Sequence, residues 1–430
     1  MGVNEVLILL LSFFVLLAIG VPVAYSIGLS SLFTLLVSMP SLPAVTTLAQ
    51  RIATGLDSFA LLAIPFFILS GQLMNRGGIA TRLIDFAKVL VGRLPGGLAY
   101  VNILACMLFG AISGSAVAAA SAIGGFMIPR MEEEGYDKSF SAAVNLTSAT
   151  TGLIIPPSNI LIIYSLASGG ASIAALFLAG YIPGLLIGAA LMVVAGILSR
   201  KTKVKTERIT ISRGLHIMLR ALPSLVLLLI VIGGIVAGIF TATEASAIAV
   251  LYTFILAFLY KEITTRDIPS ILLETVKTTS IVMLLIGTSM GMSWVMSYEN
   301  IPQDLTSFMM GISDNPIIIL LIINAILLAV GIFMDITPSV LIFTPIFLPV
   351  VTELGMSPIH FGIIMVMNLC IGLCTPPVGS VLFVGCSVAG VKIRQVLRPL
   401  VPMFLAMLVV LLLTTFIPSL STWIPSLFGF

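Results

Sequence analysis

The chain has 430 residues, of which 59% are hydrophobic and only 9% are charged. A soluble domain carries about 25% charged residues, so this composition excludes an ordinary soluble protein. The formal net charge of +3 does not require a nucleic-acid partner, because basic cytoplasmic loops are typical of membrane proteins. The composition therefore predicts a protein embedded in a lipid bilayer.

Three long runs contain no charged residue: residues 6–50, 139–199 and 354–391. Each run is longer than the roughly 20 apolar residues that cross a bilayer as a helix. The alternating segments of about ten residues that form membrane β-barrels do not occur. We predict an all-α polytopic membrane protein, whose first apolar stretch is a retained span and not a signal peptide.

The most polar stretch runs from Arg200 to Arg220 and holds seven basic residues against one acidic residue. By the positive-inside rule, this stretch faces the cytoplasm. It lies near the middle of the chain, which suggests a linker between two similar halves. We therefore predict a first repeat at 1–199, a basic cytoplasmic linker at 200–220 and a second repeat at 221–430.

A shift of 220 residues aligns the two halves without a gap. It places Pro156-Pro157 on Pro376-Pro377, Gly152 on Gly372, Gly71 on Gly291 and Ser26 on Ser246. Several matches involve glycine or proline, whose roles depend on backbone position, so chance pairing of apolar residues does not account for them. The alignment predicts an internal repeat.

Loop charges have opposite bias at equivalent positions of the two halves. Residues 75–94 hold four basic residues and one acid, whereas residues 295–314 hold three acids and no base. Residues 392–398 hold three bases, and their equivalent, 172–178, is uncharged. This pattern predicts repeats of inverted topology, each with an odd number of crossings, about five.

The double proline of each half predicts a break in a transmembrane helix. The first lies in the run from Thr151 to Asn159, and the second in residues 371–379. Adjacent prolines remove backbone donors and clash with the preceding turn, so upstream carbonyl groups lose their helical partners. In a membrane such carbonyls are tolerated only against protein or a wet cavity, where they can coordinate a cation.

A second pair of breaks is predicted at residues 109–115 and 330–338. The first is a run of glycine and serine, and the second places Asp335 at the position equivalent to Ser115. A carboxylate at the centre of a membrane costs about 2.5–3.5 kcal/mol, so such a residue is normally functional or paired. Glu244 is the other acid in an apolar stretch, and it either caps a helix, lies at an interface or takes part in function.

These motifs resemble the large membrane subunit of tripartite ATP-independent periplasmic (TRAP) transporters over essentially the whole chain. The resemblance lies in Ile64-Pro-Phe-Phe-Ile-Leu-Ser-Gly71, Ser113-Gly-Ser115 and the two double-proline runs. It implies an elevator-type fold with two helical hairpins, and sodium-coupled uptake across the bacterial inner membrane. It also implies a separate small four-helix membrane subunit and a periplasmic substrate-binding protein. Members that import sialic acid are the most similar in appearance, so an organic acid, with sialic acid first, is the expected substrate.

The resemblance also implies ligands for two sodium ions and for the substrate. The first sodium site would use Gly110, Ser113, Gly152 and Ile155, and the second Gly331, Asp335, Gly372 and Thr375. The substrate would lie near Ser115, Asn159 and Thr337. Oxygen ligands suit a sodium ion, and a carboxylate in one site would raise its affinity.

We also expect a division into moving and fixed parts. Hairpins around Ile64–Met74 and Met283–Trp294 would travel together with both double-proline segments. The spans near Val6–Leu36 and Ser224–Tyr260 would stay fixed as a scaffold. Such an elevator would carry its site along the membrane normal.

Other functions remain open at this stage. An ion channel would need a continuous polar pore, and a carboxylate/sodium symporter could work without a binding protein. An intramembrane enzyme would need a nucleophile–base pair or a metal set, yet His216 and His360 are both expected to be solvated. There is no glycine-rich phosphate loop with a lysine, so direct coupling to ATP is not supported.

Overall fold

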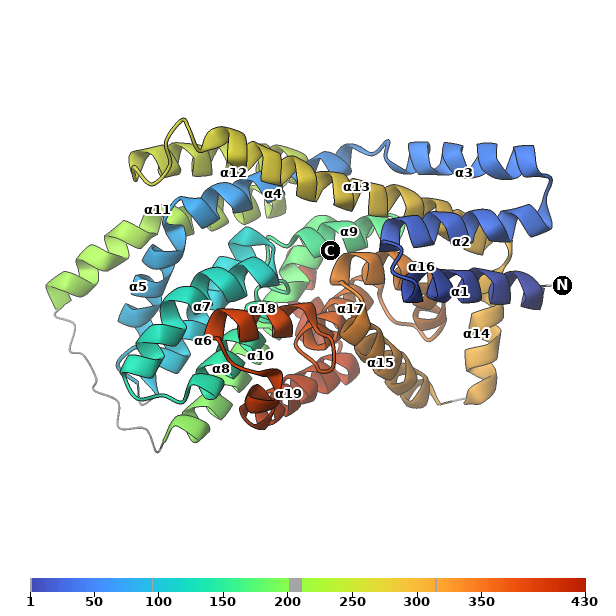
Figure 1. The fold of residues 1–430 in the computed structure, drawn as a ribbon. Helices are drawn as coiled ribbons and strands as arrows, with labels where there is room; N and C mark the ends of the chain where they lie inside the picture. Colours follow the sequence, from blue (N-terminus) through green and yellow to red (C-terminus); the bar gives the residue numbers. More distant parts are fainter. Residues whose placement is uncertain (1, 95, 201–210, 314) are drawn as a thin grey trace.

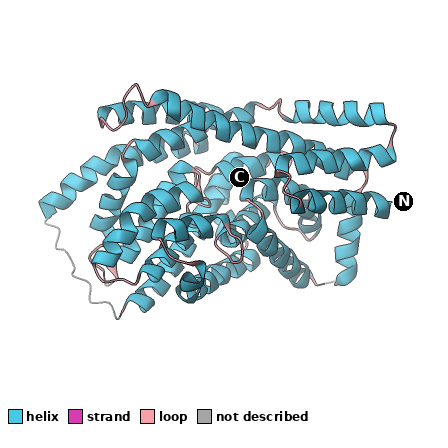
Figure 2. Cartoon of the chain, in the orientation of Figure 1, coloured by secondary structure: helices cyan, strands magenta, loops and turns pink. Residues whose placement is uncertain are grey.

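The computed structural model describes residues 2–94, 96–200, 211–313 and 315–430. Throughout these ranges the regular elements are helices and no strand occurs (Figure 2). Eight helices in the described part are long and apolar enough to cross a membrane. The predicted all-α polytopic fold is therefore confirmed.

The first half contains ten α-helices and a short 3-10 helix among its described residues. They are α1 (Gly2–Ala18), α2 (Val23–Ser38), α3 (Ser41–Gly55), η1 (Phe59–Leu62), α4 (Ala63–Arg76), α5 (Ile79–Val91), α6 (Gly97–Ser113), α7 (Ala116–Glu133), α8 (Lys138–Thr151), α9 (Asn159–Ala167) and α10 (Ile173–Ser199).

The described part of the second half also contains ten α-helices. They are α11 (Ile211–Val236), α12 (Ala242–Leu259), α13 (Ile268–Tyr298), α14 (Ile301–Ile312), α15 (Pro316–Phe333), α16 (Ile336–Glu353), α17 (Pro358–Leu373), α18 (Ser380–Ala389), α19 (Ile393–Phe416) and α20 (Ser419–Leu427). Helix α11 already begins within the predicted linker, and residues 201–210 of that linker lie outside the described residues.

Equivalent elements follow one another in the same order in both halves. Helices α7 and α16 begin and end 220 residues apart, and each double proline is followed by a short helix, α9 or α18. One pair differs. Residues 56–62, a loop and η1, separate α3 from α4, whereas the equivalent residues 276–282 lie inside the continuous helix α13. The internal repeat seen in the sequence is thus also a repeat of helices.

Helices α3 and α13 of the two halves pack against each other in opposite directions. Helix α3 packs on α13 so that Leu48 lies against Gly291 and Leu56 against Gly287. Residue numbers therefore rise along α3 as they fall along α13, so the two helices pack antiparallel. Arg51 places its guanidinium 4.9 Å from the centre of the Trp294 ring at the same contact.

The helices form two layers (Figure 1). In that view α3, α4, α12 and α13 form the upper layer, and α6–α8 with α15, α17 and α19 lie below it. Helices α5 and α14 descend from the upper layer at opposite ends and lead to α6 and α15. The broken helices and the tight helix pairs lie in the lower layer.

The predicted hairpins were wrong in position. Residues 64–74 lie inside the single helix α4, and residues 283–294 lie within the continuous helix α13. The tight helical hairpins are α6–α7 and α15–α16, whose helices are separated by only two residues each. Glycine and serine at one tip, and Met334-Asp335 at the other, end the first helix and start the next.

The structure shows the surroundings of Glu244 and His360, two polar residues that the sequence singled out. Thr241 and Glu244 form a reciprocal capping box at the start of α12, in which the Thr241 amide donates to Glu244 Oε2 at 2.8 Å. The capping interpretation of Glu244 is therefore confirmed. His360 was expected to be solvated, but it is buried, with its Nδ1 2.6 Å from Ser421 Oγ.

Candidate functional site

The first hairpin turns at Gly114 and Ser115, between α6 and α7. Gly114 has φ +63°, and a Cβ atom there would lie 2.7 Å from Nδ2 of Asn159. A glycine is therefore needed both for the left-handed backbone and for the close approach of the tip to α9. Ser115 caps α7 by accepting a bond of 3.2 Å from the Ala118 amide.

Each hairpin crosses a broken helix at a pair of glycines. A Cβ atom added to Gly110 would lie 2.7 Å from Cα of Gly152, where α6 meets the end of α8. One added to Gly372 would lie 2.5 Å from Cα of Gly331, where α15 meets α17. The two crossings are equivalent in the repeat, and each brings the backbone of a hairpin against the start of a break.

The first break covers residues 152–158, between α8 and α9, and contains a cis peptide bond at Pro156-Pro157. The Ser158 hydroxyl donates to the Leu153 carbonyl and thereby satisfies part of the opened backbone. None of the described hydrogen bonds reaches the carbonyl oxygens of Gly152 or Ile155. These two oxygens are among the predicted sodium ligands.

The second break covers residues 374–379, between α17 and α18, with its cis bond at Pro376-Pro377. The Gly379 amide reaches across to the hairpin and donates to the Ile332 carbonyl at 3.0 Å. Thr375 Oγ1 donates to the Ile371 carbonyl at 2.7 Å, and the Gly372 carbonyl accepts the Thr375 amide at 2.9 Å. The Gly372 carbonyl is thus bonded, whereas the equivalent Gly152 carbonyl of the first break accepts none of the described hydrogen bonds.

A cavity of about 310 Å³ lies where the hairpin tips meet the breaks. Its wall also includes residues of α4 and α13. No lysine or arginine lies among the described residues of this wall. The polar residues that line it are Gln72, Asn75, Ser113, Ser115, Asn159, Thr278, Asp335, Thr337 and Ser380.

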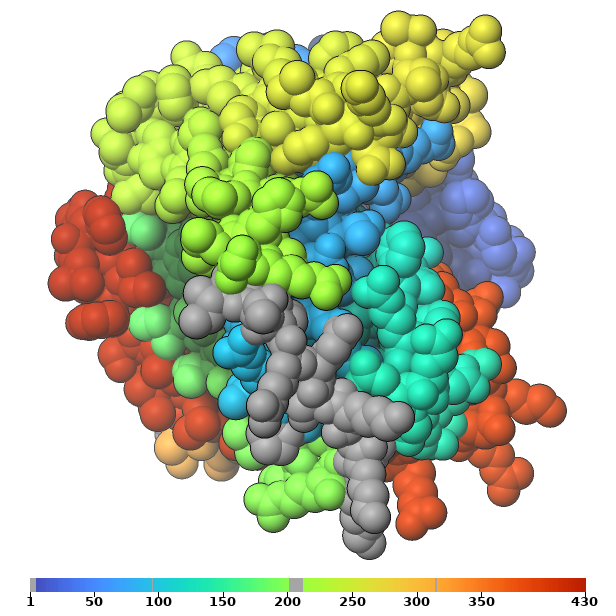
Figure 3. All heavy atoms as spheres, turned by 90° about the vertical axis from the view of Figure 1, so that its left-hand side faces the viewer, coloured from blue at the N-terminus to red at the C-terminus, as the bar shows by residue number. Residues whose placement is uncertain are grey.

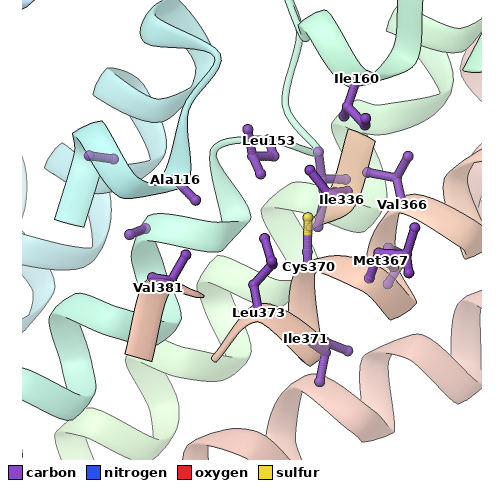
Figure 4. Packing of buried hydrophobic residues seen from close by; sticks show 14 of the residues in the cluster. Ala116, Leu153, Ile160, Ile336, Val366, Met367, Cys370, Ile371, Leu373 and Val381 are labelled. Atoms are coloured by element: carbon purple, nitrogen blue, oxygen red, sulfur yellow. The ribbon is translucent and has the colours of Figure 1, made fainter. Parts of the chain in front are cut away.

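Buried apolar side chains from both halves support this region. Leu153 of the first break, Leu373 before the second break and Ile336 after the second hairpin tip gather near one another (Figure 4). Ala116, Ile160 and Val381, also shown in Figure 4, belong to the first turns of three helices that start here. The helix ends are therefore fixed by packing that combines residues far apart in the chain.

Four helices begin at the cavity. The first residues of α7, α9, α16 and α18 all line it: Ala116, Asn159, Ile336 and Ser380. The N-terminus of a helix leaves amide hydrogens without intrahelical partners and carries a partial positive charge of roughly half a unit. The cavity can therefore attract an anion although no basic side chain lines it.

Asp335 is the one charged side chain among the described residues that line the cavity. It occupies the position before α16, keeps exposed surface, and its side chain does not cap that helix. A carboxylate beside an anion site is unfavourable unless a cation accompanies it. This placement suits a site that takes up a cation and an anion together.

The structure places five of the eleven predicted site residues on the wall of one cavity. The other six do not line that cavity. Ser113, Ser115, Asn159, Asp335 and Thr337 line the cavity. The remaining six predicted residues lie at the two glycine crossings and in the breaks: Gly110, Gly152, Ile155, Gly331, Gly372 and Thr375.

Sequence reasoning missed four polar residues of the wall: Gln72, Asn75, Thr278 and Ser380. Ser380 comes directly after Gly379, which is the repeat equivalent of the predicted site residue Asn159. The repeat therefore pointed to this neighbourhood. Gln72 and Asn75 are two amides one turn apart in an apolar helix, which was a further available signal.

The sequence matches a family model over residues 10–420, described as the DctM component of tripartite ATP-independent periplasmic transporters. The protein YgiK of Salmonella typhimurium is 56% identical, over 99% of this chain and 98% of its own length. A C4-dicarboxylate TRAP transporter large permease of Pseudomonas aeruginosa is 42% identical over 94% of both chains. A sialic acid TRAP transporter large permease of Vibrio cholerae is 38% identical over 96% of both chains.

Among solved structures, the YdaH transporter of Alcanivorax borkumensis has a similar fold. The TM-score is 0.65 at 12% sequence identity, with 90% of this chain and 89% of that chain covered. At this identity the likeness concerns the fold alone. Within the described part of the chain, no three His, Cys, Asp or Glu side chains are grouped as they would be around a metal ion.

Proposed function

The chain belongs to the DctM family of TRAP transporter large permeases, and on this premise we propose that it carries out sodium-coupled uptake of an organic acid. It is a multi-pass protein of the bacterial inner membrane and a transport component, not an enzyme. The convergence of four helix N-termini on one cavity is the observation that supports an acidic substrate.

The substrate class follows from the chemistry of the cavity. A carboxylate can accept hydrogen bonds from the free amides at the starts of α7, α9, α16 and α18, with hydroxyls of Ser115 and Thr337 nearby. Related large permeases are named for C4-dicarboxylate, 2,3-diketo-L-gulonate and sialic acid, all of which are organic acids. Sialic acid is one candidate among these, and sequence identity does not favour it over a C4-dicarboxylate.

Two sodium ions would bind behind the cavity, at the two glycine crossings. In the first site, the free carbonyl oxygens of Gly152 and Ile155 would act with oxygen atoms of Gly110 and Ser113. Several neutral oxygen ligands suit a hard monovalent cation. The second site would use Gly331, Asp335, Gly372 and Thr375, where the carboxylate adds a full negative charge.

Coupling would follow from charge balance. Without a cation, the Asp335 carboxylate repels an organic acid in the same cavity. A bound sodium ion removes that repulsion, so each ligand raises the affinity for the other. Inward movement of each uncompensated positive charge gains about 2.3 kcal/mol per 100 mV, so uptake of a monoanion with two sodium ions would be electrogenic.

The chain would work with two partners. A tripartite periplasmic system implies a small membrane subunit beside this large one, and a periplasmic protein that delivers the substrate. We expect the small subunit to have four helices. Much of the substrate selection would lie in the periplasmic protein.

Reconstitution into proteoliposomes tests this proposal. Uptake of succinate, sialic acid and 2,3-diketo-L-gulonate is measured with an inward sodium gradient, with and without the two partners. Uptake that needs sodium and the periplasmic protein is expected. Uptake without the periplasmic protein would favour a simple carboxylate/sodium symporter, and passive sodium flux without any acid would favour a channel.

A further inference from the structure

Helix α4 presents two side-chain amides to the cavity from outside the hairpins. Gln72 and Asn75 lie one turn apart on the cavity wall, on the same face as Ile68 and Gly71. No hydrogen bond of either side chain to the described protein occurs. Each amide therefore keeps two N–H donors and one carbonyl oxygen for a ligand.

Helix α4 and the η1 before it are bonded to α12 and α13, the other helices beside them in the upper layer. The preceding η1 is bonded to the start of α12, and the C-terminal half of α4 itself is bonded to α12 and α13. The hydrogen bonds are Thr243 Oγ1 to the Phe59 carbonyl at 2.9 Å, Thr253 Oγ1 to Ser70 Oγ at 3.4 Å, and Arg76 to Ser270 Oγ at 2.6 Å.

The turn after α4 is held in the same way. A Cβ atom on Gly78 would lie 2.8 Å from Oε1 of Glu262, and the Arg82 guanidinium lies 3.6 Å from the centre of the Tyr260 ring. Figure 3 shows this end of the molecule, with the segment around residue 260 above the start of α5. Because α4 packs on α12, it is fixed to a helix that belongs to the predicted scaffold.

The contact between α4 and the first hairpin is of a different kind. Gly71 lies against the Ser113 carbonyl, and a Cβ atom there would be only 2.8 Å from that oxygen. No side-chain hydrogen bond links the two helices within the described residues. The cavity thus lies between a helix bonded to the upper layer and hairpin tips that can part from it.

We propose that Gln72 and Asn75 form a stationary polar wall that binds the substrate and determines which organic acid is accepted. This inference rests on the proposed function. The four helix N-termini hold the carboxylate, so the two amides meet the remainder of the molecule. Neutral amides can pair with a hydroxyl, a carbonyl or a second carboxylate, and their spacing selects among these.

The proposal changes the expected division of the molecule. Residues 64–74 stay with α12 instead of travelling with the hairpins. When the hairpin tips move away from α4, the substrate loses both amides and keeps only its contacts to the helix N-termini. Selection by Gln72 and Asn75 therefore acts only while the cavity adjoins α4.

The first experiment measures sodium-driven uptake by the complete transporter with Gln72→Ala and Asn75→Ala, singly and together. The probes are succinate, sialic acid and 2,3-diketo-L-gulonate. For the double variant we expect KM of the preferred acid to rise about ten-fold, and the order of preference among the acids to change. The half-saturating sodium concentration should remain as in the wild type. Gln50→Ala, on the exposed side of α3, is the matched control.

Equal KM and equal preference in the wild type and the double variant would overturn the proposal. A change in sodium dependence of the same size would overturn it too, because that would indicate a general disturbance of the cavity. Failure of the wild-type complex to take up any of the acids would instead reject the proposed function itself. Thermal unfolding of each purified variant verifies that the fold is kept.

The second experiment tests whether α4 is stationary. A disulfide between Ser70→Cys and Thr253→Cys, whose hydroxyls lie 3.4 Å apart, should leave uptake unchanged. A bifunctional thiol reagent that joins Gln72→Cys to Asn159→Cys should abolish the uptake that the same double variant shows before the reagent is added, because it ties the wall to α9. Loss of uptake with the first pair, or full uptake with the second pair joined, would contradict a stationary α4.

Discussion

The two hairpin tips occupy equivalent positions in the repeat but differ in charge. The first turns at Gly114-Ser115 and carries only a hydroxyl, whereas the second turns at Met334-Asp335 and carries a carboxylate. In the first break the Gly152 carbonyl accepts none of the described hydrogen bonds, whereas in the second the equivalent Gly372 carbonyl accepts the Thr375 amide. The two halves therefore share one backbone geometry, but the first offers only neutral oxygen atoms at its tip and the second offers the Asp335 carboxylate.

This difference indicates how one scaffold can hold two ions and an acid. A neutral site depends on exposed carbonyls, and a charged site depends on one side chain. The repeat gives both sites the same backbone shape, and single residues such as Ser115 and Asp335 determine whether a site is neutral or charged. Substitutions at equivalent positions can therefore separate the two contributions.

The largest effect is expected at the glycine crossings, which the two halves share. Gly152→Val and Gly372→Val would each place side-chain atoms inside the backbone of the facing hairpin helix. Overpacking of this kind against backbone costs roughly 1–3 kcal/mol or more, so both variants should unfold at a lower temperature and lose transport. Gly125→Ala, with no atom within 4 Å of its added Cβ, should behave as the wild type. A variant that keeps normal stability at either crossing would show that the close approach is not required.

The next effect separates the two tips. Asp335→Asn should raise the half-saturating sodium concentration at least ten-fold, because the amide keeps the shape but removes the charge. Ser115→Ala, at the equivalent position, should raise KM for the acid with little change in sodium affinity. Sodium titration of uptake by both variants measures the difference. Identical sodium curves for Asp335→Asn and the wild type would assign Asp335 a structural role.

A smaller effect is expected from the polar supports behind the crossings. Asn368 donates to Asn324 Oδ1 at 2.6 Å and so joins α17 to α15, whereas Asn145 donates to the Ala120 carbonyl at 2.8 Å and joins α8 to α7. Replacing Asn368 with alanine leaves the buried Asn324 Oδ1 unpaired, and replacing Asn145 removes a buried bond between helices; each should cost about 1–3 kcal/mol of stability.

The two asparagine variants should differ in transport. Asn368→Ala loosens the hairpin whose tip carries Asp335, so it should weaken sodium binding a few-fold. Asn145→Ala should lower stability with less effect on sodium. Thermal unfolding and sodium titration on the same preparations test this. An equal change in the half-saturating sodium concentration in both variants would mean that neither asparagine acts on one sodium site in particular.

The smallest effect concerns the starts of two equivalent helices, α12 and α2. Helix α12 begins with the Thr241–Glu244 capping box, whereas α2, its equivalent, begins after Pro22 without a side-chain cap. Thr241→Ala should lower stability by about 1 kcal/mol and leave uptake kinetics unchanged. Altered sodium or substrate dependence in this variant would show that the cap has a role beyond the helix start.

The sequence by itself determined the class of the protein, the repeat and the breaks. Composition placed the chain in a membrane, because long uncharged runs are stable as spanning helices in lipid. Paired prolines predicted where helices end, because their effect on the backbone is local. Asp335 stood out for the same reason, since a charge in an apolar run is visible without knowledge of its neighbours.

Only the tertiary structure decided which helix pairs are hairpins, which residues share the cavity and where His360 lies. An apolar helix that ends in a tight turn and one that continues have similar amino-acid patterns. The predicted positions of both hairpins were therefore wrong. The meeting of four helix N-termini depends on residues more than 200 positions apart, such as Ala116 and Ser380. Gln72 and Asn75 stand out as two amides in an apolar stretch, but only the structure shows that they line the cavity beside the tips, because packing, and not local pattern, determines what faces a cavity.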